Sequence, residues 1–155
     1  MGAFLKMEGV DGESRMKGYE GWVVLTTASS PIHRSIPAGA RGVDREKGST
    51  TLGEMVITRG VDKSSVKLAE RCAKGKIIDE VQVHFTSMQE GGEAAFMTYK
   101  LKNVIATNWS FNGKYEDQTP LEDLTLNYES VEWTYTVFEN GKKKGQVSGS
   151  FSPNR

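Results

Sequence analysis

The sequence predicts a mainly β protein with one flanking α-helix, at about residues 62–75, and one long extended loop, at about residues 28–50. Three observations support this prediction. Several segments alternate apolar and polar residues with the period of a β-strand. One segment repeats its apolar residues with the period of an α-helix. Another shows neither pattern and is interrupted by proline and glycine. The chain has 155 residues, the size of one domain with a substantial hydrophobic core, so we expect a single domain over residues 1–155.

Two strands are expected near the N-terminus. The segment "AFLKMEG", residues 3–9, places Ala3, Leu5 and Met7 on one face. The segment "GYEGWVVLTT", residues 18–27, has apolar residues on both faces. Because a strand with two apolar faces is typically covered on both sides, this second strand is expected inside the fold.

The long loop, "ASSPIHRSIPAGARGVDREKGST" at residues 28–50, holds two of the four prolines and three glycines. Loops without secondary structure beyond about 12–15 residues are uncommon in compact domains, and such loops are usually functional or disordered. Its charged residues are of both signs, which suits contact with another protein. The sequence therefore marks this loop as a candidate functional segment.

The segment "LGEMVITRGV", residues 52–61, resumes as a strand, and "VDKSSVKLAERCAKGK", residues 61–76, then reads as a helix. Asp62 is a suitable N-cap and Gly75 a suitable C-terminal stop. At about 100° per residue, the apolar side chains fall within about 160° of the helix circumference. They are Val66, Leu68, Ala69, Cys72 and Ala73. The helix is therefore expected to lie on the surface with one buried stripe.

Strands dominate the second half of the chain. They are expected in "EVQVHFTSM" (80–88), "FMTYKLKNVIATNWSF" (96–111), "LTLNYESVEWTYTVF" (124–138) and "QVSGSF" (146–151). In the third segment the apolar residues change from even to odd positions. A break or bulge at Glu129-Ser130 is predicted, because a shift of one residue moves side chains to the other face. Asn140-Gly141 is a strong signal for a β-hairpin turn.

Composition narrows the possible functions. Lysine plus arginine and aspartate plus glutamate each number 20, so the formal net charge is zero, and bulk charge favours neither nucleic acid nor anionic lipid. The single cysteine cannot form an internal disulfide. The N-terminal residues lack the apolar core of a signal peptide, and no stretch is long enough to span a bilayer. The chain is expected to fold in the cytoplasm, without membrane insertion.

No group of residues has the pattern of a catalytic, cofactor or metal site, and none of these is expected. Cys72 reads as a small residue on the apolar helix stripe. His33 and His84 have no metal-ligand spacing. The segment "GARGVDREKGS" lacks the ending and context of a phosphate-binding loop. Trp22, Trp109 and Trp133 lie in or near apolar strands and are expected in the core or an interface.

Five segments together resemble the Hcp (haemolysin-coregulated) tube proteins of bacterial type VI secretion. They are "FLKMEGVDGES" (4–14), "SIPAGARGVDREKG" (35–48), "VDKSSVKLAERCAKGK" (61–76), "YKLKNVIAT" (99–107) and "LTLNYESVEWTY" (124–135), in the family's order. The resemblance implies a compact β-barrel of two packed sheets with one flanking helix. It also implies a structural protein that is not an enzyme.

The same resemblance implies partners. Protomers would form a homohexameric ring, and stacked rings would form a hollow tube that a contractile sheath propels from the cell without a signal peptide. The spike protein VgrG would cap the tube, and effector proteins could ride in its lumen. Because a ring needs a repeating contact between copies, the charged part of the loop is the expected subunit interface. Its residues are Arg41, Asp44, Arg45, Glu46 and Lys47.

Two other functions remain open from the residues. One is a monomeric β-barrel that binds a small molecule, with Trp22, Trp109 and Trp133 lining its cavity. That interpretation leaves residues 28–50 unexplained. The other is an enzyme, which would require a catalytic cluster that the sequence does not show.

Overall fold

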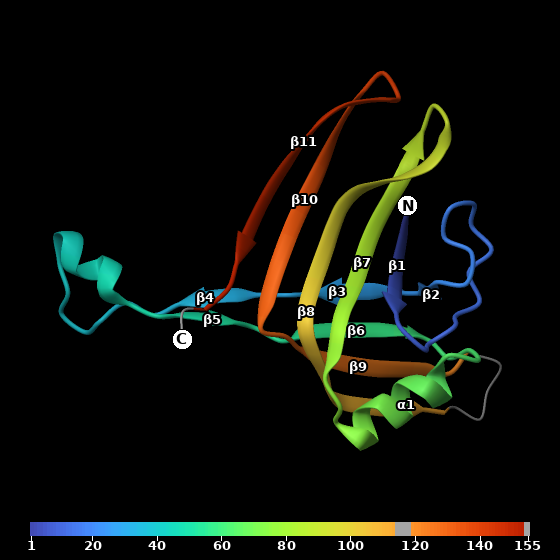
Figure 1. The fold of residues 1–155 in the computed structure, drawn as a ribbon, viewed down its shortest axis with the longest axis horizontal. Helices are drawn as coiled ribbons and strands as arrows, with labels where there is room; N and C mark the ends of the chain where they lie inside the picture. The colour runs from blue at the N-terminus through green and yellow to red at the C-terminus, as the bar shows by residue number, and fades with distance from the viewer. Residues whose placement is uncertain (114–118, 154–155) are drawn as a thin grey trace.

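A computed structural model of the chain describes residues 1–113 and 119–153. Nine of its strands form one antiparallel sheet that divides into two layers (Figure 1). The order in the first layer is β2 (Val23–Val24), β1 (Gly2–Met7), β7 (Ile78–Gln89), β8 (Gly92–Asn112), β10 (Ser130–Glu139) and β11 (Lys142–Phe151). The second layer continues from β8 to β9 (Leu121–Asn127), β6 (Met55–Gly60) and β3 (Thr27–Ser29). A separate pair joins β4 (Ile32–Arg34) to β5 (Thr50–Leu52).

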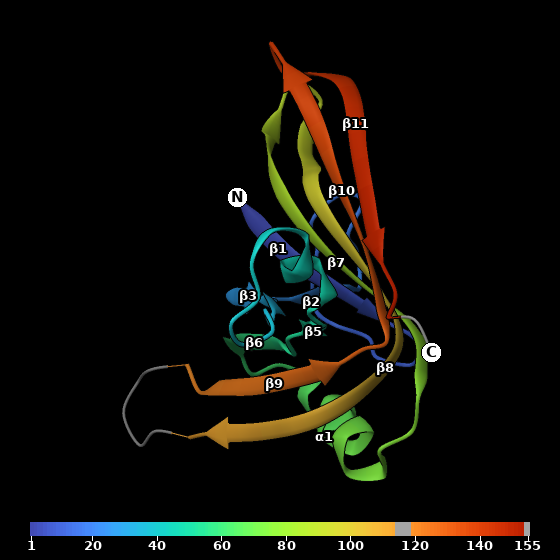
Figure 2. The same cartoon turned by 90° about the vertical axis from the view of Figure 1, so that its left-hand side faces the viewer.

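Strand β8 belongs to both layers. Its first half pairs with β7 and β10, and its second half turns away to pair with β9 (Figure 2). Asn103, at the change of partner, has φ of 52°, a left-handed conformation that asparagine tolerates better than most residues. The bend lets one 21-residue strand carry side chains into the core from two directions.

The hydrophobic core lies between the two layers. The alternating residues predicted for the strands supply most of it, including Leu5, Val81, Val83, Leu101, Ile57, Leu124 and Leu126. Each of these side chains is fully buried, and each is worth about 1.5–3 kcal/mol of burial. The predicted fold class, mainly β with two packed sheets and one flanking helix, is confirmed.

The two layers form a compact sandwich rather than a closed barrel. The chain also crosses between the layers at residues 25 and 26, where Leu25 N donates to Ala3 O over 2.8 Å and Thr26 N donates to Thr58 O over 3.0 Å. Within residues 1–113 and 119–153, no ladder joins β2 to β3 at this crossing. The barrel that the resemblance implied is therefore open along this side.

The strand predicted at residues 18–27 is largely wrong. Only Val23 and Val24 pair with β1, and the preceding residues form an irregular loop. Gly12 N donates to Gly21 O over 2.8 Å, and Ser14 N donates to Trp22 O over 3.1 Å. Because these bonds fold the segment back on itself, its backbone groups are satisfied locally and not by a neighbouring strand.

The predicted helix is present and shorter, with α1 spanning Ser65–Lys74. The N-cap position falls at Ser64, which forms no side-chain capping bond, and not at Asp62. Asp62 lies two residues earlier, where its Oδ1 accepts a hydrogen bond from Ser64 N in the turn that leads into the helix. Leu68 is fully buried and Cys72 packs against the core, as expected. Val66 is 72% exposed, against expectation. Val66 and Leu68 lie about 160° apart at the two edges of the predicted stripe, and only the side that carries Leu68 is buried.

The turns of the C-terminal half are confirmed. Strands β9 and β10 are separated at Tyr128 and Glu129, where the break was predicted. Asn140 and Gly141 connect β10 to β11 and have φ of 54° and 79°. A two-residue hairpin turn of this kind requires both of its central residues to adopt the left-handed conformation.

Candidate functional site

The predicted loop at residues 28–50 is an ordered arm and not an irregular loop. We define the arm as residues 32–52, comprising β4, the short 3-10 helix η1 (Gly42–Lys47) and β5. It extends from one side of the body, with η1 at its far end (Figure 1). The register His33 opposite Thr51 places the single histidine of the arm on an exposed ribbon. Single-sequence periodicity could not detect these strands, because each has three residues.

Hydrogen bonds within the arm hold its shape. Ser35 and Ser49 face each other, with their hydroxyls 2.9 Å apart and Ser35 N donating to Ser49 O over 2.8 Å. Arg34 reaches along the ribbon, and its Nη2 donates to Glu46 O over 2.5 Å. These contacts join the two sides of the arm, so η1 is presented by a braced ribbon.

The structure gathers all five predicted interface residues at the end of the arm. Arg41 precedes η1, and Asp44, Arg45, Glu46 and Lys47 lie within it. Lys47 Nζ lies 3.1 Å from Asp44 Oδ1, and Arg45 Nε donates to Gly42 O over 3.1 Å. All five are exposed, and no residue of η1 is buried. Arg41 and the carboxylate of Glu46 thus remain on the surface, where a partner could meet them.

The arm also exposes apolar side chains that the sequence analysis did not single out. Val43 is 76% exposed and Ile36 is 58% exposed. Exposed apolar side chains on a projecting segment are a common feature of protein contacts. The end of the arm therefore offers both charge and apolar surface.

A buried ion network was missed by the sequence analysis. Arg59 of β6 is 1% exposed and Glu122 of β9 is fully buried, and Arg59 Nη1 pairs with Glu122 Oε1. Trp109 Nε1 donates to Glu122 Oε2 over 2.7 Å, and Arg59 Nε donates to Val24 O over 2.9 Å. The two charges are thus paired and hydrogen-bonded, which is the condition for burying them.

A signal for this network was present in the strand patterns. Arg59 shares the odd positions of Met55 and Ile57, and Glu122 shares the even positions of Leu124 and Leu126. A charged residue at a core-facing position needs a partner of opposite charge. Pattern alone could have placed both residues inward, although not opposite each other.

Asp62 extends the network to the start of the helix. Its Oδ2 lies 2.8 Å from Arg59 Nη2. Burial raises the pKa of Asp62, but the hydrogen bonds from Ser64 and Arg59 outweigh burial, and the pKa falls below its ordinary value. The network therefore connects the two central strands of the second layer to α1.

His84, which showed no metal-ligand spacing in the sequence, lies in an aromatic cluster on β7. Its Nδ1 is 2.9 Å from the hydroxyl of Tyr19, and the rings of Tyr19 and Phe4 stack with centroids 4.6 Å apart. The ring of Trp22 lies against the ring of His84, with the two ring centroids 4.8 Å apart. Burial lowers the pKa of His84, which favours the neutral ring. This cluster fastens the irregular loop before β2 onto the first layer.

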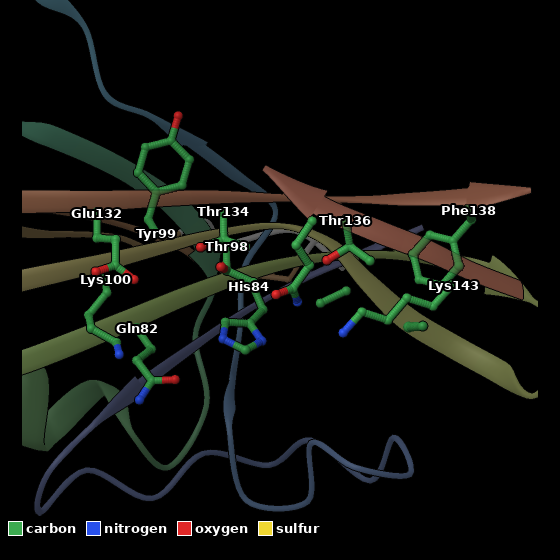
Figure 3. A pocket seen from close by; sticks show the side chains of 13 residues that line it. Gln82, His84, Thr98, Tyr99, Lys100, Glu132, Thr134, Thr136, Phe138 and Lys143 are labelled. Carbon is green, nitrogen blue, oxygen red and sulfur yellow. The ribbon is translucent and has the colours of Figure 1, made fainter. Parts of the chain in front are cut away.

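A cavity of about 610 Å³ lies on the outer face of the first layer (Figure 3). Polar side chains from β7, β8, β10 and β11 line most of it, among them Gln82, His84, Thr98, Glu132 and Thr134. No tryptophan lines it. Trp109 and Trp133 pack against the core, as predicted. Trp22 packs against His84 instead and is not part of the core cluster.

Within residues 1–113 and 119–153, no group of three or more His, Cys, Asp and Glu side chains is placed to hold a metal ion. No helix in the same part of the chain is long and apolar enough to cross a membrane.

Comparisons with known proteins agree on the fold. The chain is similar to the solved structure of a type six secretion system protein, at 22% identity with a TM-score of 0.87, covering 97% of this chain and 94% of that one. It is also similar to Hcp1 from Salmonella typhimurium, at 21% identity with a TM-score of 0.75 and coverage of 97% and 93%. A type VI secretion system effector from Yersinia pestis matches at 19% identity with a TM-score of 0.74 and coverage of 97% and 99%.

At these identities the structural likeness establishes the fold alone. No curated protein sequence matched the chain. The family model described as "Type VI secretion system effector, Hcp" matches residues 4–135, which is most of the chain and includes the arm, α1 and the buried network. The chain therefore belongs to the Hcp family of type VI secretion system proteins.

Proposed function

We propose that the protein is the tube subunit of a type VI secretion system. Six copies close into a ring, and rings stack into a hollow tube that a contractile sheath drives out of the cell. The observation that carries the proposal is the arm, which projects from the body with its charged end exposed (Figure 1). A segment held in a definite shape away from its own core is suited to contact a neighbouring copy, and a repeating contact of this kind builds closed rings.

The end of the first layer offers a second surface for ring closure. Tyr135 of β10 and Val147 of β11 lie opposite each other, 50% and 66% exposed. They continue the face on which Val131 is buried, beyond the area that the second layer covers. In the described part of the chain β11 pairs only with β10, which leaves its other edge open to a strand of another chain. These features support contact between copies.

Family membership supports the remaining partners and the location. In the proposed assembly the tube meets the sheath along its outside and the spike protein VgrG at its end, and effector proteins travel in the lumen. The protein assembles in the cytoplasm and leaves the cell as part of the tube. The proposed role is structural and needs no catalytic residue or cofactor.

Replacing residues 38–47 with a short glycine-serine linker tests the proposal. We expect the body to keep its circular dichroism spectrum and cooperative melting, because no residue of η1 is buried. Electron microscopy should show loss of stacked rings. The double variant Arg41→Glu, Arg45→Glu should weaken assembly at low salt, and added salt should partly relieve the loss by screening the new repulsion. The matched control, Arg15→Glu with Lys17→Glu, makes the same charge change at exposed residues outside the arm.

Light scattering on a sizing column provides the decisive measurement for the ring. A stable monomer at tens of micromolar wild-type protein would contradict the proposed function. Normal tubes from the linker variant would show that the arm is not needed for assembly, while the proposed ring would still stand. An unfolded linker variant would show that the arm belongs to the folding unit of the protomer.

A further inference from the structure

A second charged surface lies on the solvent side of α1. Figure 1 shows that this helix is well away from the arm. It is a cavity of about 260 Å³ between the helix and the turn after β1, which we call the helix pocket. Its lining comprises Gly9, Lys67, Glu70, Arg71, Lys74 and Lys76. Neither the proposed ring contacts nor the core uses these residues.

The helix pocket follows from helix geometry and one close approach. Lys67, Arg71 and Lys74 are spaced by four and three residues, so they lie on the same side of α1. Arg71 Nη2 donates to Glu8 O over 2.6 Å, which fixes the guanidinium across the turn. Gly9 has φ of +78°, and a Cβ there would lie 2.5 Å from Arg71 Nη2. The glycine therefore leaves the space that the arginine occupies.

Cations outnumber anions in the helix pocket. Four of its lining residues are basic and one, Glu70, is acidic, which leaves three positive charges in excess. Glu70 Oε1 lies 3.6 Å from the Nζ atoms of both Lys67 and Lys74, and these two ammonium groups lower the pKa of Glu70. The chain as a whole is neutral, so the excess is local to this surface.

We infer that the helix pocket binds an acidic segment of a partner protein, through carboxylate side chains that pair with Lys67, Arg71, Lys74 and Lys76. Its volume is below the roughly 300–1,000 Å³ typical of pockets for cofactors and drug-sized ligands, and suits one or two side chains. Nucleic acid fits less well, because binding a phosphate backbone needs a long basic stripe and gains from net positive charge, and this chain is neutral.

Binding of fluorescent octaglutamate, followed by anisotropy at 50 and 500 mM salt, tests the inference. Wild-type protein should bind at low salt and lose most of its affinity at high salt, since exposed ion pairs are screened. The variant Lys67→Glu, Lys74→Glu should bind at least about tenfold more weakly, because two weak attractions become repulsions. The matched control, Arg15→Glu with Lys17→Glu, should bind like wild type.

Three outcomes would overturn the inference. One is the absence of octaglutamate binding to wild type at low salt. Another is equal loss of binding in the control, which would assign the effect to overall charge. The third is a higher affinity for an eight-base single-stranded DNA of equal charge, which would assign the helix pocket to nucleic acid. Because the inference does not depend on the arm, light scattering on the same samples separates its failure from failure of ring assembly. Circular dichroism confirms that each variant is folded.

Discussion

Removing the buried carboxylate of Glu122 should destabilise the protein more than any surface substitution. Glu122→Ala leaves Arg59, which is 1% exposed, with Asp62 as its remaining carboxylate partner, and it leaves the indole N–H of Trp109 without its acceptor. Breaking a buried pair by removing one partner costs about 3–5 kcal/mol. That is a large share of the roughly 5–15 kcal/mol that stabilises a typical domain.

Urea denaturation, followed by tryptophan fluorescence and circular dichroism, measures the loss. For a slope of about 2 kcal/mol per molar urea, the midpoint should fall by about 1.5–2.5 M. The double variant Arg59→Met, Glu122→Leu removes both buried charges together and should lose less than Glu122→Ala alone. Asp62 then loses Arg59, but its carboxylate is partly exposed and keeps the hydrogen bond from Ser64 N, so no fully buried charge is left unpaired. All variants are compared at one protein concentration, since self-association would itself raise apparent stability.

The exposed pair of Glu139 and Lys144, 3.0 Å apart, provides the control. Glu139→Ala should change the free energy of unfolding little, because exposed ion pairs contribute weakly. If Glu122→Ala lost less than about 1 kcal/mol, Arg59 would be finding water or another partner on mutation, and the reasoning from burial would be wrong.

Two further predictions concern the helix and its entry. The pKa of Asp62 is lower in the folded protein than its ordinary value of 3.8. The stability that its carboxylate contributes is therefore present above pH 3.8 and is lost as the pH falls through the folded pKa. The free energies of unfolding of wild type and Asp62→Asn, measured as the pH is lowered, should differ least at the lowest pH. Cys72→Ala should leave the fold and assembly intact with a modest loss of stability, whereas Leu68→Asp should unfold the domain by placing an unpaired charge in the core, as thermal melts and light scattering would reveal. If Cys72→Ala folded but failed to assemble, the interpretation of Cys72 as a core residue would be wrong. If Leu68→Asp melted as cooperatively as wild type, the expected unfolding would be wrong.

Strand alternation predicted the long elements well. The alternation in residues 80–88 and 124–138 places inward the side chains that the structure buries as far as Val131, among them Val81, Val83, Leu124 and Leu126, whereas Tyr135 and Val137 of the same pattern are exposed. The change of parity near Glu129 is where β9 ends and β10 begins. These predictions succeeded because alternation is a property of the extended backbone itself. The hairpin at Asn140-Gly141 succeeded for a related reason, since the turn requires two left-handed residues.

Short and irregular elements were predicted poorly. Strand β2 has two residues, and β4 and β5 have three each, which is too few for a period to appear. The helix begins at Ser65, three residues after Asp62, because residues 63 and 64 form a turn. Asp62 Oδ2 also pairs with Arg59, a contact between the strand and the turn that no helix signal contains. The five arm residues were correctly grouped in sequence, and their contact with a second copy stays a prediction.

By itself, the sequence determined which of the long segments are extended, which segment is helical, where the C-terminal strands turn and which family the chain resembles. Only the tertiary structure decided which strands pair, that β8 serves two layers, and that Arg59 and Glu122 meet from positions 63 residues apart. The physical reason is the distance along the chain over which each interaction acts. Backbone period and turn chemistry act over a few neighbouring residues. The pairing of buried charges and of distant strands depends instead on how the whole chain removes its apolar surface from water.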